Sequence, residues 1–201
     1  MNNSKNYKLD LATVSTKTIT SIEQAKNIFI SKKDCRVTDL NIMAIVPTDQ
    51  LFDQSFIDQI PDEGFLISPD SYKLLNKLTH LSMTENKKGI IGNSKQGDLI
   101  IPIKTEGIEF FSGFESQIPT EESFTTEFKK ILEAILLDEN ENVYTFLNTT
   151  INPKLLFNLS KAIGLGDYGL IMTNYSNDKT IVRSQNKDNK AVGLIMRIKN
   201  E

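Results

Sequence analysis

The chain has 201 residues, of which 39% are hydrophobic and 24% are charged, and its formal net charge is -3. This length allows one large core or two small ones, and the charge balance excludes the global basicity of many nucleic-acid binders, so that any surface meeting nucleic acid must be local. Cys35 is the only cysteine and His80 the only histidine, which excludes a disulfide framework and a Cys/His zinc site within one chain.

The first quarter of the chain is predicted to be mainly extended. Its N-terminus, MNNSKNYKLD, is polar where a signal peptide is apolar, and no segment approaches the roughly 20 apolar residues of a membrane span, so we expect a cytoplasmic protein without membrane contact. Alternation at 8–14 and short apolar runs at 26–30 and 35–46 predict strands. Thr20 and Glu23 have the spacing of a capping box that opens a brief helix.

The next stretch carries clearer signals. The apolar run at 64–67 predicts a strand, and Ser68 followed by Pro69 is a good N-cap with proline at the first helical position, which predicts a helix to about Leu81. Three short apolar runs separated by Gly, Asn, Asp and Lys predict strands at 89–92, 99–103 and 108–111.

The last part of the chain repeats this order. A linker at 119–122 sets a predicted boundary between domains 1–119 and 120–201, and helical apolar spacing predicts an amphipathic helix over about 125–137. An apolar run at 143–147 then precedes Asn152 and Pro153, which open a helix over 154–163, and strands are predicted at 170–173, 180–183 and 192–198.

An internal repeat follows from the two helices. KLLNKL at 73–78 matches KLLFNL at 154–159, and an alignment on Pro69 and Pro153 differs from this register by about one helical turn, so both alignments place the same side chains on the same face. The predicted fold is therefore α+β, with repeated β-α-β-β-β units, antiparallel sheets and few helices.

Motifs for catalysis and for cofactors are better explained as structure. GLGDYG at 164–169 matches GxGxxG literally, but it follows a helix and precedes a strand, so no helix N-terminus is left to hold phosphate. DENEN at 138–142 lacks the glycine and glutamate of a calcium loop. We interpret His80 as a solvated helix residue and Cys35 as a buried small side chain. The sequence thus predicts no enzyme, no cofactor and no metal site.

Each of the two repeated helices has a polar stripe beside its apolar face. The first apolar face holds Leu74, Leu75, Leu78 and Leu81, and the second holds Leu155, Leu156, Leu159 and Ala162. The polar stripes hold Lys73, Lys77 and His80 in the first helix and Lys154, Asn158 and Lys161 in the second. Asp70 is the only carboxylate beside them, so these ammonium groups suit an approach to phosphates, although a solvated lysine-rich face explains them as well.

Several segments resemble bacterial sliding clamps, the beta subunit of the replicative polymerase. NTTINPKLLFNLSKAIG, its following strands and the terminal VGLIMRI are similar to the last unit of that family. RVTDL at 36–40 with AIV at 44–46 resembles its strand with a Thr-Asp signature, and GFESQIP at 113–119 resembles the segment that closes a clamp domain. The resemblance touches about 120 residues.

The resemblance implies a ring with helices on its inner wall, which encircles duplex DNA without reading its sequence and tethers a DNA polymerase. It implies DNA-facing residues at Lys73, Lys77, Lys154, Asn158 and Lys161, with Lys129 and Lys130 as further candidates. It also implies an apolar pocket for partner peptides at Leu194, Ile195 and Met196, flanked by Arg197.

The assembly expected from the resemblance is a homo-oligomer. A two-domain chain that closes a ring more naturally forms a trimer. Two alternatives remain: a monomeric clamp-like module that binds replication proteins without encircling DNA, and an enzyme, which needs a buried acidic pair or a nucleotide pocket.

Overall fold

A computed structural model of the chain describes residues 9–15, 22–114, 124–127, 153–164, 170–174 and 179–196. The helices are α1 (Ala12–Ser15), α2 (Gln54–Ile57), α3 (Pro69–Leu75) and α6 (Pro153–Ala162), with 3-10 turns η1 (Glu23–Lys26), η2 (Thr48–Gln50) and η3 (Ile108–Phe111). The strands are β1 (Ile28–Ile30), β2 (Asp34–Thr38), β3 (Ile42–Pro47), β4 (Phe65–Ile67), β5 (Thr79–Met83), β6 (Gly89–Ser94), β7 (Gly97–Pro102), β8 (Phe124–Glu127), β9 (Leu170–Asn174), β10 (Lys179–Ser184) and β11 (Val192–Met196).

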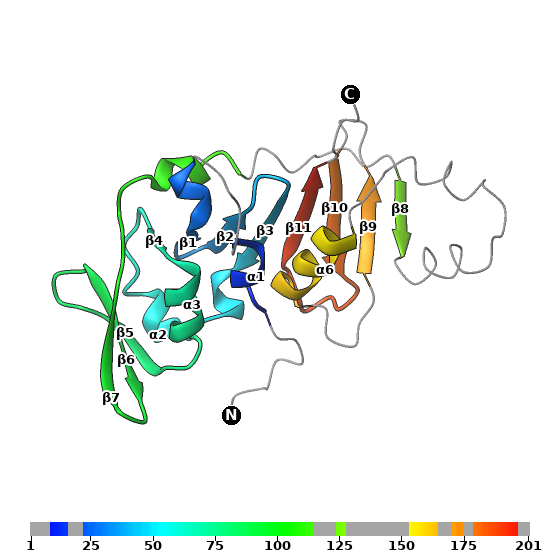
Figure 1. The fold of residues 1–201 in the computed structure, drawn as a ribbon. Helices are drawn as coiled ribbons and strands as arrows, with labels where there is room; N and C mark the ends of the chain where they lie inside the picture. Colours follow the sequence, from blue (N-terminus) through cyan, green and yellow to red (C-terminus); the bar gives the residue numbers. More distant parts are fainter. Residues whose placement is uncertain are drawn as a thin grey trace.

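The larger of two antiparallel sheets has eight strands and a symmetric order, β4-β1-β2-β3-β11-β10-β9-β8. Each half consists of three consecutive strands with one additional strand on the outer edge, β4 beside β1 and β8 beside β9. The halves meet where β3 pairs with β11, from Ile42 opposite Ile195 to Ile45 opposite Val192. Figure 1 shows this junction in the middle of the sheet, between the blue and the red strands. The pairing joins the two predicted domains through backbone hydrogen bonds.

The smaller sheet holds β5, β6 and β7 in sequence order. It follows α3, just as β9, β10 and β11 follow α6, while β1, β2 and β3 follow α1 after the intervening turn η1. The unit of one helix and three consecutive antiparallel strands that the sequence shows twice therefore occurs three times in the described part of the chain. The additional copy escaped the sequence because α1 is only four residues long.

Local signals explain why the elements begin and end where they do. Ser68 caps α3, since its side chain accepts a hydrogen bond from the Ser71 N–H at 3.1 Å, and Pro69 fills the first turn as expected. In the hairpin between β2 and β3, the Thr38 hydroxyl donates to the Ile42 carbonyl at 2.8 Å and Leu40 takes a left-handed φ of 75°. The cap that opens α3 and the strand pair ending at Pro47 confirm the sequence-based expectation.

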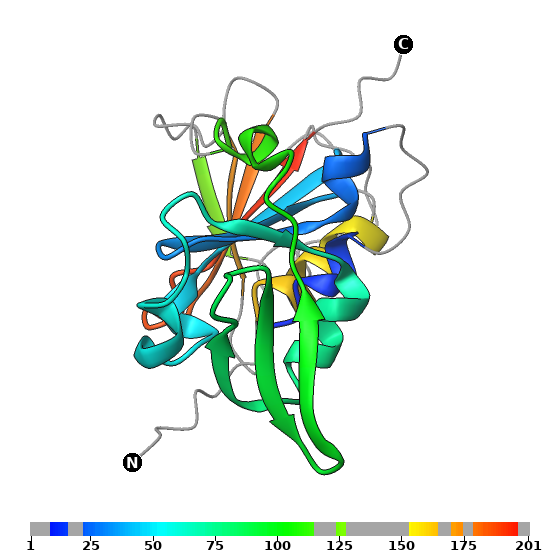
Figure 2. The same ribbon diagram turned by 90° about the vertical axis from the view of Figure 1, so that its left-hand side faces the viewer.

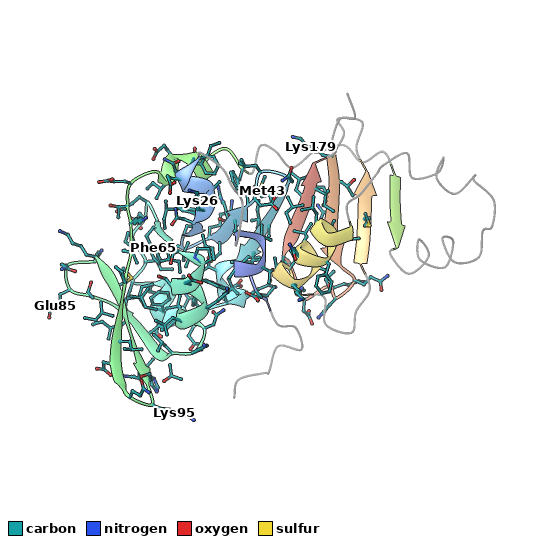
Figure 3. All side chains as sticks on the ribbon, viewed as in Figure 1. Lys26, Met43, Phe65, Glu85, Lys95 and Lys179 are labelled. Atoms are coloured by element: carbon teal, nitrogen blue, oxygen red, sulfur yellow. The ribbon has the colours of Figure 1, made fainter. Side chains whose placement is uncertain are left out.

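The large sheet buries side chains on both faces. One cluster, under the helices, includes Ile28, Val37, Val46, Tyr72 and Leu159. A smaller cluster on the opposite face comprises Phe29, Met43, Leu66, Phe111, Phe114, Ile181 and Leu194. Figure 3 shows Met43 and Phe65 among these packed side chains. β1 and β3 are covered on both faces and are nearly continuous apolar runs. The equally buried β2 alternates, with Asp34, Arg36 and Thr38 on one face and Cys35 and Val37 on the other.

Four predicted elements differ in the structure. The predicted strand at 8–14 is wrong, because residues 12–15 form α1. The predicted strand at 108–111 is also wrong, because these residues form η3. In η3, Phe111 stacks on Phe29 with ring centroids 5.6 Å apart. The helix expected to reach Leu81 ends at Leu75, and residues 79–83 pair with β6 as β5. Residues 125–127 belong to β8 instead of opening a helix. In each case, pairing or packing with distant residues overrides the local pattern.

The remaining sequence predictions fall outside the described residues. These are the strand at 143–147, the linker at 119–122 and the rest of the helix expected to 137. The GLGDYG motif is described only at Gly164, which follows α6 with a φ of 62°, consistent with a helix C-terminus.

Candidate functional site

Three helices, α3, α1 and α6, lie in a row on one side of the large sheet (Figures 1 and 2). The central helix α1 contacts both neighbours and also β2 and β3, while α6 contacts β3 and β11. The row therefore reaches the β3–β11 junction, with α1 over β2 and β3 and α6 over the junction itself. This arrangement presents a helical surface opposite the face that carries the cluster around Phe111.

The α6 helix is held on the sheet by close packing and by one side chain, Asn189, that makes two hydrogen bonds at its C-terminus. Leu159 is fully buried, and a Cβ added at Gly193 of β11 would lie only 2.7 Å from its side-chain carbons, so the glycine allows α6 to approach the strand. At the C-terminus of α6, the Asn189 side chain donates to the carbonyl oxygens of Ile163 and Gly164 at 2.7 and 2.8 Å. These contacts satisfy carbonyls that a helix end leaves without partners.

Contacts between α1 and α6 fix the middle of the row. The Thr13 hydroxyl donates to the main-chain carbonyl of Asn158 at 3.1 Å, and the Asp10 N–H donates to the carbonyl of Lys161 at 3.1 Å. Two predicted DNA-facing residues thus anchor α1 through their backbone, which leaves their side chains out of this contact.

The α3 helix buries a face that differs in part from the predicted one. Tyr72 and Leu75 are buried, whereas Leu74 is 40% exposed and was wrongly placed on the apolar face. Leu78 and Leu81 pack against the core, but they do so from beyond the helix, beside Gly92 of β6. Burial raises the pKa of the Tyr72 hydroxyl, and within the described residues this oxygen has no hydrogen-bond partner.

The structure describes the side chains of three of the six predicted lysines on this helical side. Lys73 and Lys161 are exposed on α3 and α6, and Lys77 is exposed in the turn after α3 rather than on the helix. Lys154 belongs to the first turn of α6, but its side chain lies outside the described part, as do Lys129 and Lys130. The structure thus brings Lys73, Lys77 and Lys161 to the same row of helices, with α1 between the two groups.

The electrostatic surroundings of these lysines are mild. Lys73 Nζ lies 3.8 Å from Asp70 Oδ1, and both side chains are largely exposed, so this pair contributes little and leaves the ammonium accessible. Lys161 Nζ lies 4.1 Å from the ring centroid of Phe157, which is 57% exposed. Asn158 is half-buried.

The predicted peptide-pocket residues are packed into the sheet. Leu194 and Ile195 are 2% and 3% exposed and belong to the clusters on opposite faces, as alternation along a strand requires. The Met196 side chain and Arg197 lie outside the described residues. The burial of two of the four residues means that a peptide site here would depend on the end of β11.

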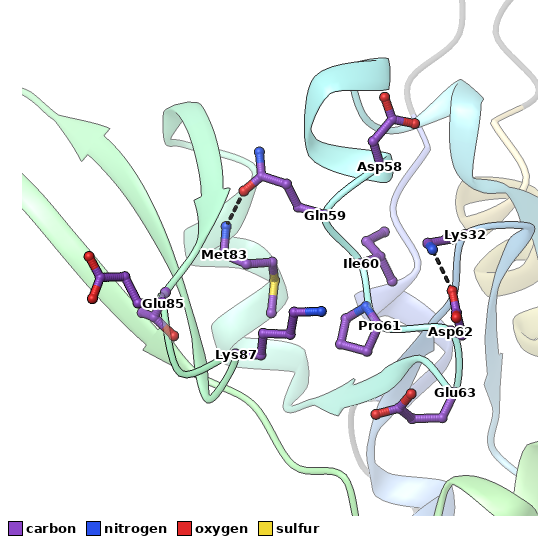
Figure 4. A pocket seen from close by; sticks show the side chains of 11 residues that line it. Lys32, Asp58, Gln59, Ile60, Pro61, Asp62, Glu63, Met83, Glu85 and Lys87 are labelled. Carbon is purple, nitrogen blue, oxygen red and sulfur yellow. Dashed lines mark hydrogen bonds and ion pairs between the residues drawn. The ribbon is translucent and has the colours of Figure 1, made fainter.

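Two open cavities of about 450 Å³ each lie elsewhere, around the small sheet. Figure 4 shows the first, where Gln59 Oε1 accepts a hydrogen bond from the Met83 N–H at 2.9 Å and Lys32 pairs with Asp62. The hydrogen bond from Lys32, and then its charge, lower the pKa of the Asp62 carboxyl.

The second cavity is lined by Leu51–Asp53, Ser55–Phe56, Leu75–Asn76 and Leu78–Leu81. His80 borders this cavity from β5 with a left-handed φ of 52°, which corrects its predicted place on a helix.

Sequence reasoning missed a buried ion pair on β2. The Arg36 guanidinium binds both Asp34 carboxylate oxygens at 2.6 and 3.0 Å and donates to the Phe111 carbonyl at 2.7 Å. It thereby attaches the η3 segment to the sheet. The available signal was an arginine two residues from an aspartate, hence on the same face of a strand.

The residues considered for chemistry lie in ordinary structural surroundings. Cys35 is buried as expected, 3.7 Å from the Thr48 hydroxyl, and burial raises the pKa of its thiol to about 12. Among the described residues, no group of three or more His, Cys, Asp or Glu side chains has a geometry able to hold a metal ion. Within the same part of the chain, no helix is long and apolar enough to cross a membrane.

The layers, the strand order and the row of helices define the class of fold: this is an α+β chain with the fold of the DNA sliding clamps. It is similar to the DNA polymerase III beta chain of Streptococcus pneumoniae TIGR4 (TM-score 0.62, 12% identity, 94% of this chain and 61% of that chain). It is also similar to the DNA polymerase III subunit beta of Borrelia burgdorferi (TM-score 0.58, 10% identity, 100% and 66%) and to the DNA polymerase sliding clamp of Bacillus subtilis (TM-score 0.56, 12% identity, 95% and 61%).

The similarity is one of fold. No family model matches the sequence, and no curated protein matches it. The chain spans 61 to 66% of the length of the clamp chains that it resembles. The resemblance inferred from sequence motifs is thus supported at the level of fold, which residue identities of 10 to 13% alone would not have established.

Proposed function

We propose that this chain is a sliding-clamp-like processivity factor, which encircles duplex DNA as a homo-oligomer and tethers partner proteins without catalysing a reaction. The observation that carries the proposal is the row of α3, α1 and α6 on one side of a sheet that continues across the β3–β11 junction. In the proposed ring, the helices would face the enclosed duplex and the sheet would face outward. The clamp fold of the similar solved structures supports the same interpretation.

In this proposal, the helical side contacts phosphates without reading bases. Lys73, Lys77 and Lys161 are exposed there, and Lys154, Lys129 and Lys130 remain candidates for the same surface. Since the chain carries a net charge of -3, binding must come from this local surface, and each lysine that contacts a phosphate contributes by releasing condensed counterions.

The test compares two triple variants with the same change in charge. We expect Lys73→Glu, Lys77→Glu and Lys161→Glu together to abolish retention on nicked circular DNA and to reduce the salt dependence of binding, by about 0.9 in logarithmic slope for each phosphate that is no longer neutralised. The control replaces Lys88, Lys95 and Lys187, which are exposed in turns outside the helix row. Equal retention by the two variants would show that the helix row does not face DNA.

The proposed contact with partner peptides lies at the end of β11. Because Leu194 is buried, Leu194→Asp would disrupt the sheet and could not distinguish the absence of a pocket from unfolding. The informative variants are Met196→Asp and Arg197→Glu, measured for binding of a polymerase-derived clamp-binding peptide with the unfolding midpoint as control. Full binding by both variants would remove this site from the proposal.

A monomeric clamp-like module that does not encircle DNA is the second candidate function. The solved clamps share the fold with this chain at 10 to 12% identity, which supports a clamp-like module without by itself supporting encirclement. A strictly monomeric mass together with release from circular DNA would support this candidate over the encircling one.

A further inference from the structure

One large aromatic side chain on the helical side lies outside the core. Phe157 belongs to α6 and is 57% exposed, whereas Leu159 and Ala162 of the same helix are buried. Figure 1 looks onto the helical side, and no labelled helix or strand lies in front of α6. Because residues four apart share a face of a helix, Phe157 lies on the same side of α6 as the exposed Lys161.

The repeat between the two helices does not require a phenylalanine at this position. KLLFNL at 154–159 matches KLLNKL at 73–78, so Phe157 corresponds to Asn76 in this register and to Lys73 when the two prolines are aligned. Both of these residues are polar and exposed. The packing of the fold therefore does not account for an aromatic ring here.

Lys161 and Phe157 form a unit of a cation and an aromatic ring. The Lys161 Nζ lies 4.1 Å from the ring centroid of Phe157, so the ammonium lies over one face of the ring. Among the described residues, Lys161 forms no ion pair with a carboxylate. Since the ammonium covers one face, the exposed part of Phe157 is the opposite face and the ring edge. The unit thus offers a flat apolar surface beside a positive charge.

This combination fits the chemistry of an unpaired nucleotide. Proteins that hold single-stranded nucleic acid stack its bases on aromatic side chains and track its backbone with positive charges. In a duplex, the faces of the bases are stacked on one another, so a protein surface beside the duplex meets phosphates and groove edges. Lysines can bind those phosphates, whereas the ring of Phe157 can stack only on a base whose face is exposed.

The charge of the helical side favours a nucleotide over an apolar peptide as the ligand of this ring. Lys73 and Lys77 are exposed on the same row of helices, and Asp70 is the one carboxylate paired with a lysine of the row in the described part of the chain. A peptide side chain would gain from the ring alone. A nucleotide gains from both the ring and the ammonium groups.

We propose that Phe157 and Lys161 form a binding site for single-stranded DNA. One unpaired base stacks on the open face of the ring, and the adjoining phosphate pairs with the Lys161 ammonium. The inference rests on the proposed function, because it takes the helical side to face DNA. It adds a substrate class to that function, namely DNA in which a single-stranded segment continues from the duplex.

Binding of defined oligonucleotides tests the stacking contact. The probes are a dT strand of about 30 nucleotides, which exceeds the site of one binding module, an abasic strand of the same length and a duplex of the same length. Phe157→Ala should weaken binding of the dT strand at least about fivefold, the lower end of what one base–aromatic stack contributes. Binding of the abasic strand and of the duplex should change less than about twofold, because neither presents a free base to the ring.

Three further variants separate stacking from other effects. Leu74→Ala removes an exposed aliphatic side chain from the same helical side and should change dT binding less than about twofold. Phe157→Tyr keeps an aromatic ring and should bind like the parent. Lys161→Ala should lower the logarithmic salt slope by about 0.7, the value for one phosphate of a single strand, whereas Phe157→Ala should leave the slope unchanged.

A tryptophan probe reports the contact directly. The chain contains no tryptophan, so Phe157→Trp introduces a single indole on α6. Stacking on a base should quench its fluorescence when the dT strand is added, and the abasic strand should leave it unchanged. Ile100→Trp is the control, because Ile100 is 67% exposed but lies on β7 of the small sheet, outside the helix row.

Three results would overturn the inference. These are a parent chain that does not bind the dT strand, a Phe157→Ala variant that binds it as tightly as the parent, and an equal loss of binding to the abasic strand. Because Phe157 is exposed, its substitutions should leave the fold intact, and circular dichroism checks that they do. Failure of the proposed function has a different readout, since the parent chain would then not be retained on nicked circular duplex DNA.

Discussion

The close packing of Leu159 of α6 on Gly193 of β11 allows a direct test of how α6 is positioned on the sheet. At Gly193, a Cβ would lie 2.7 Å from three side-chain carbons of Leu159, well inside normal contact distance. Overpacking of this kind costs about 1–3 kcal/mol, while alanine regains about 0.5–1 kcal/mol of the backbone entropy that glycine loses in a strand. We therefore expect Gly193→Ala to lower the free energy of unfolding by about 1–2 kcal/mol.

A double-mutant cycle separates this contact from a general effect on the strand. Leu159 is fully buried, so Leu159→Ala alone should cost about 2–5 kcal/mol. In the double variant, the new methyl group enters space that the leucine has vacated, and the combined loss should be smaller than the sum by about 1 kcal/mol or more. Urea denaturation, with the slope of each curve compared, gives the four free energies.

A matched control exists in the same chain. A Cβ at Gly113 would meet no atom within 4 Å, so Gly113→Ala should change stability by less than about 0.5 kcal/mol. If the losses from Gly193→Ala and Leu159→Ala add within about 0.5 kcal/mol, the two residues do not compete for space and the account of how α6 is seated is refuted.

Two further predictions concern buried polar groups. Tyr72→Phe removes a buried hydroxyl that has no hydrogen-bond partner in the described part of the chain, so it should leave stability unchanged or raise it by about 1 kcal/mol, measured by urea denaturation; a loss above about 1 kcal/mol would indicate a hidden partner. Burial raises the pKa of the Cys35 thiol to about 12, above its value of 9.0 in the unfolded chain, so its contribution to stability is fully present below pH 9 and decreases as the pH rises toward 12. Cys35→Ala should therefore flatten the decline of the unfolding midpoint between about pH 9 and 10.5, and an unchanged decline would contradict this reasoning.

Part of the candidate site was predictable because its signals are local. The lysines of the helical side were found from helical spacing, and the exposure of Lys73 and Lys161 agrees with that expectation. The burial of Leu159 and Ala162 was likewise encoded in the amphipathic pattern of α6. Lys77 is exposed as well, but it lies in the turn after α3 rather than on the helix where the spacing placed it, and its contact with DNA stays a prediction.

Other parts depended on contacts between distant residues. Leu194 and Ile195 were predicted to line a pocket because they are apolar. The sequence does not show that other residues cover both faces of β11. The ion pair between Arg36 and Asp34 is significant only because Phe111, far along the chain, supplies a carbonyl. A one-dimensional pattern cannot contain either fact.

The sequence by itself determined local elements of this protein: the Ser68–Pro69 cap, most of the strands, and α6 followed by three strands. These depend on the spacing of apolar residues and on turn chemistry within a few residues. Only the tertiary structure decided that residues 79–83 form an edge strand and that β3 meets β11. The physical reason is that strand pairing is a contact between distant segments, whose partners and register are selected by the burial they achieve together.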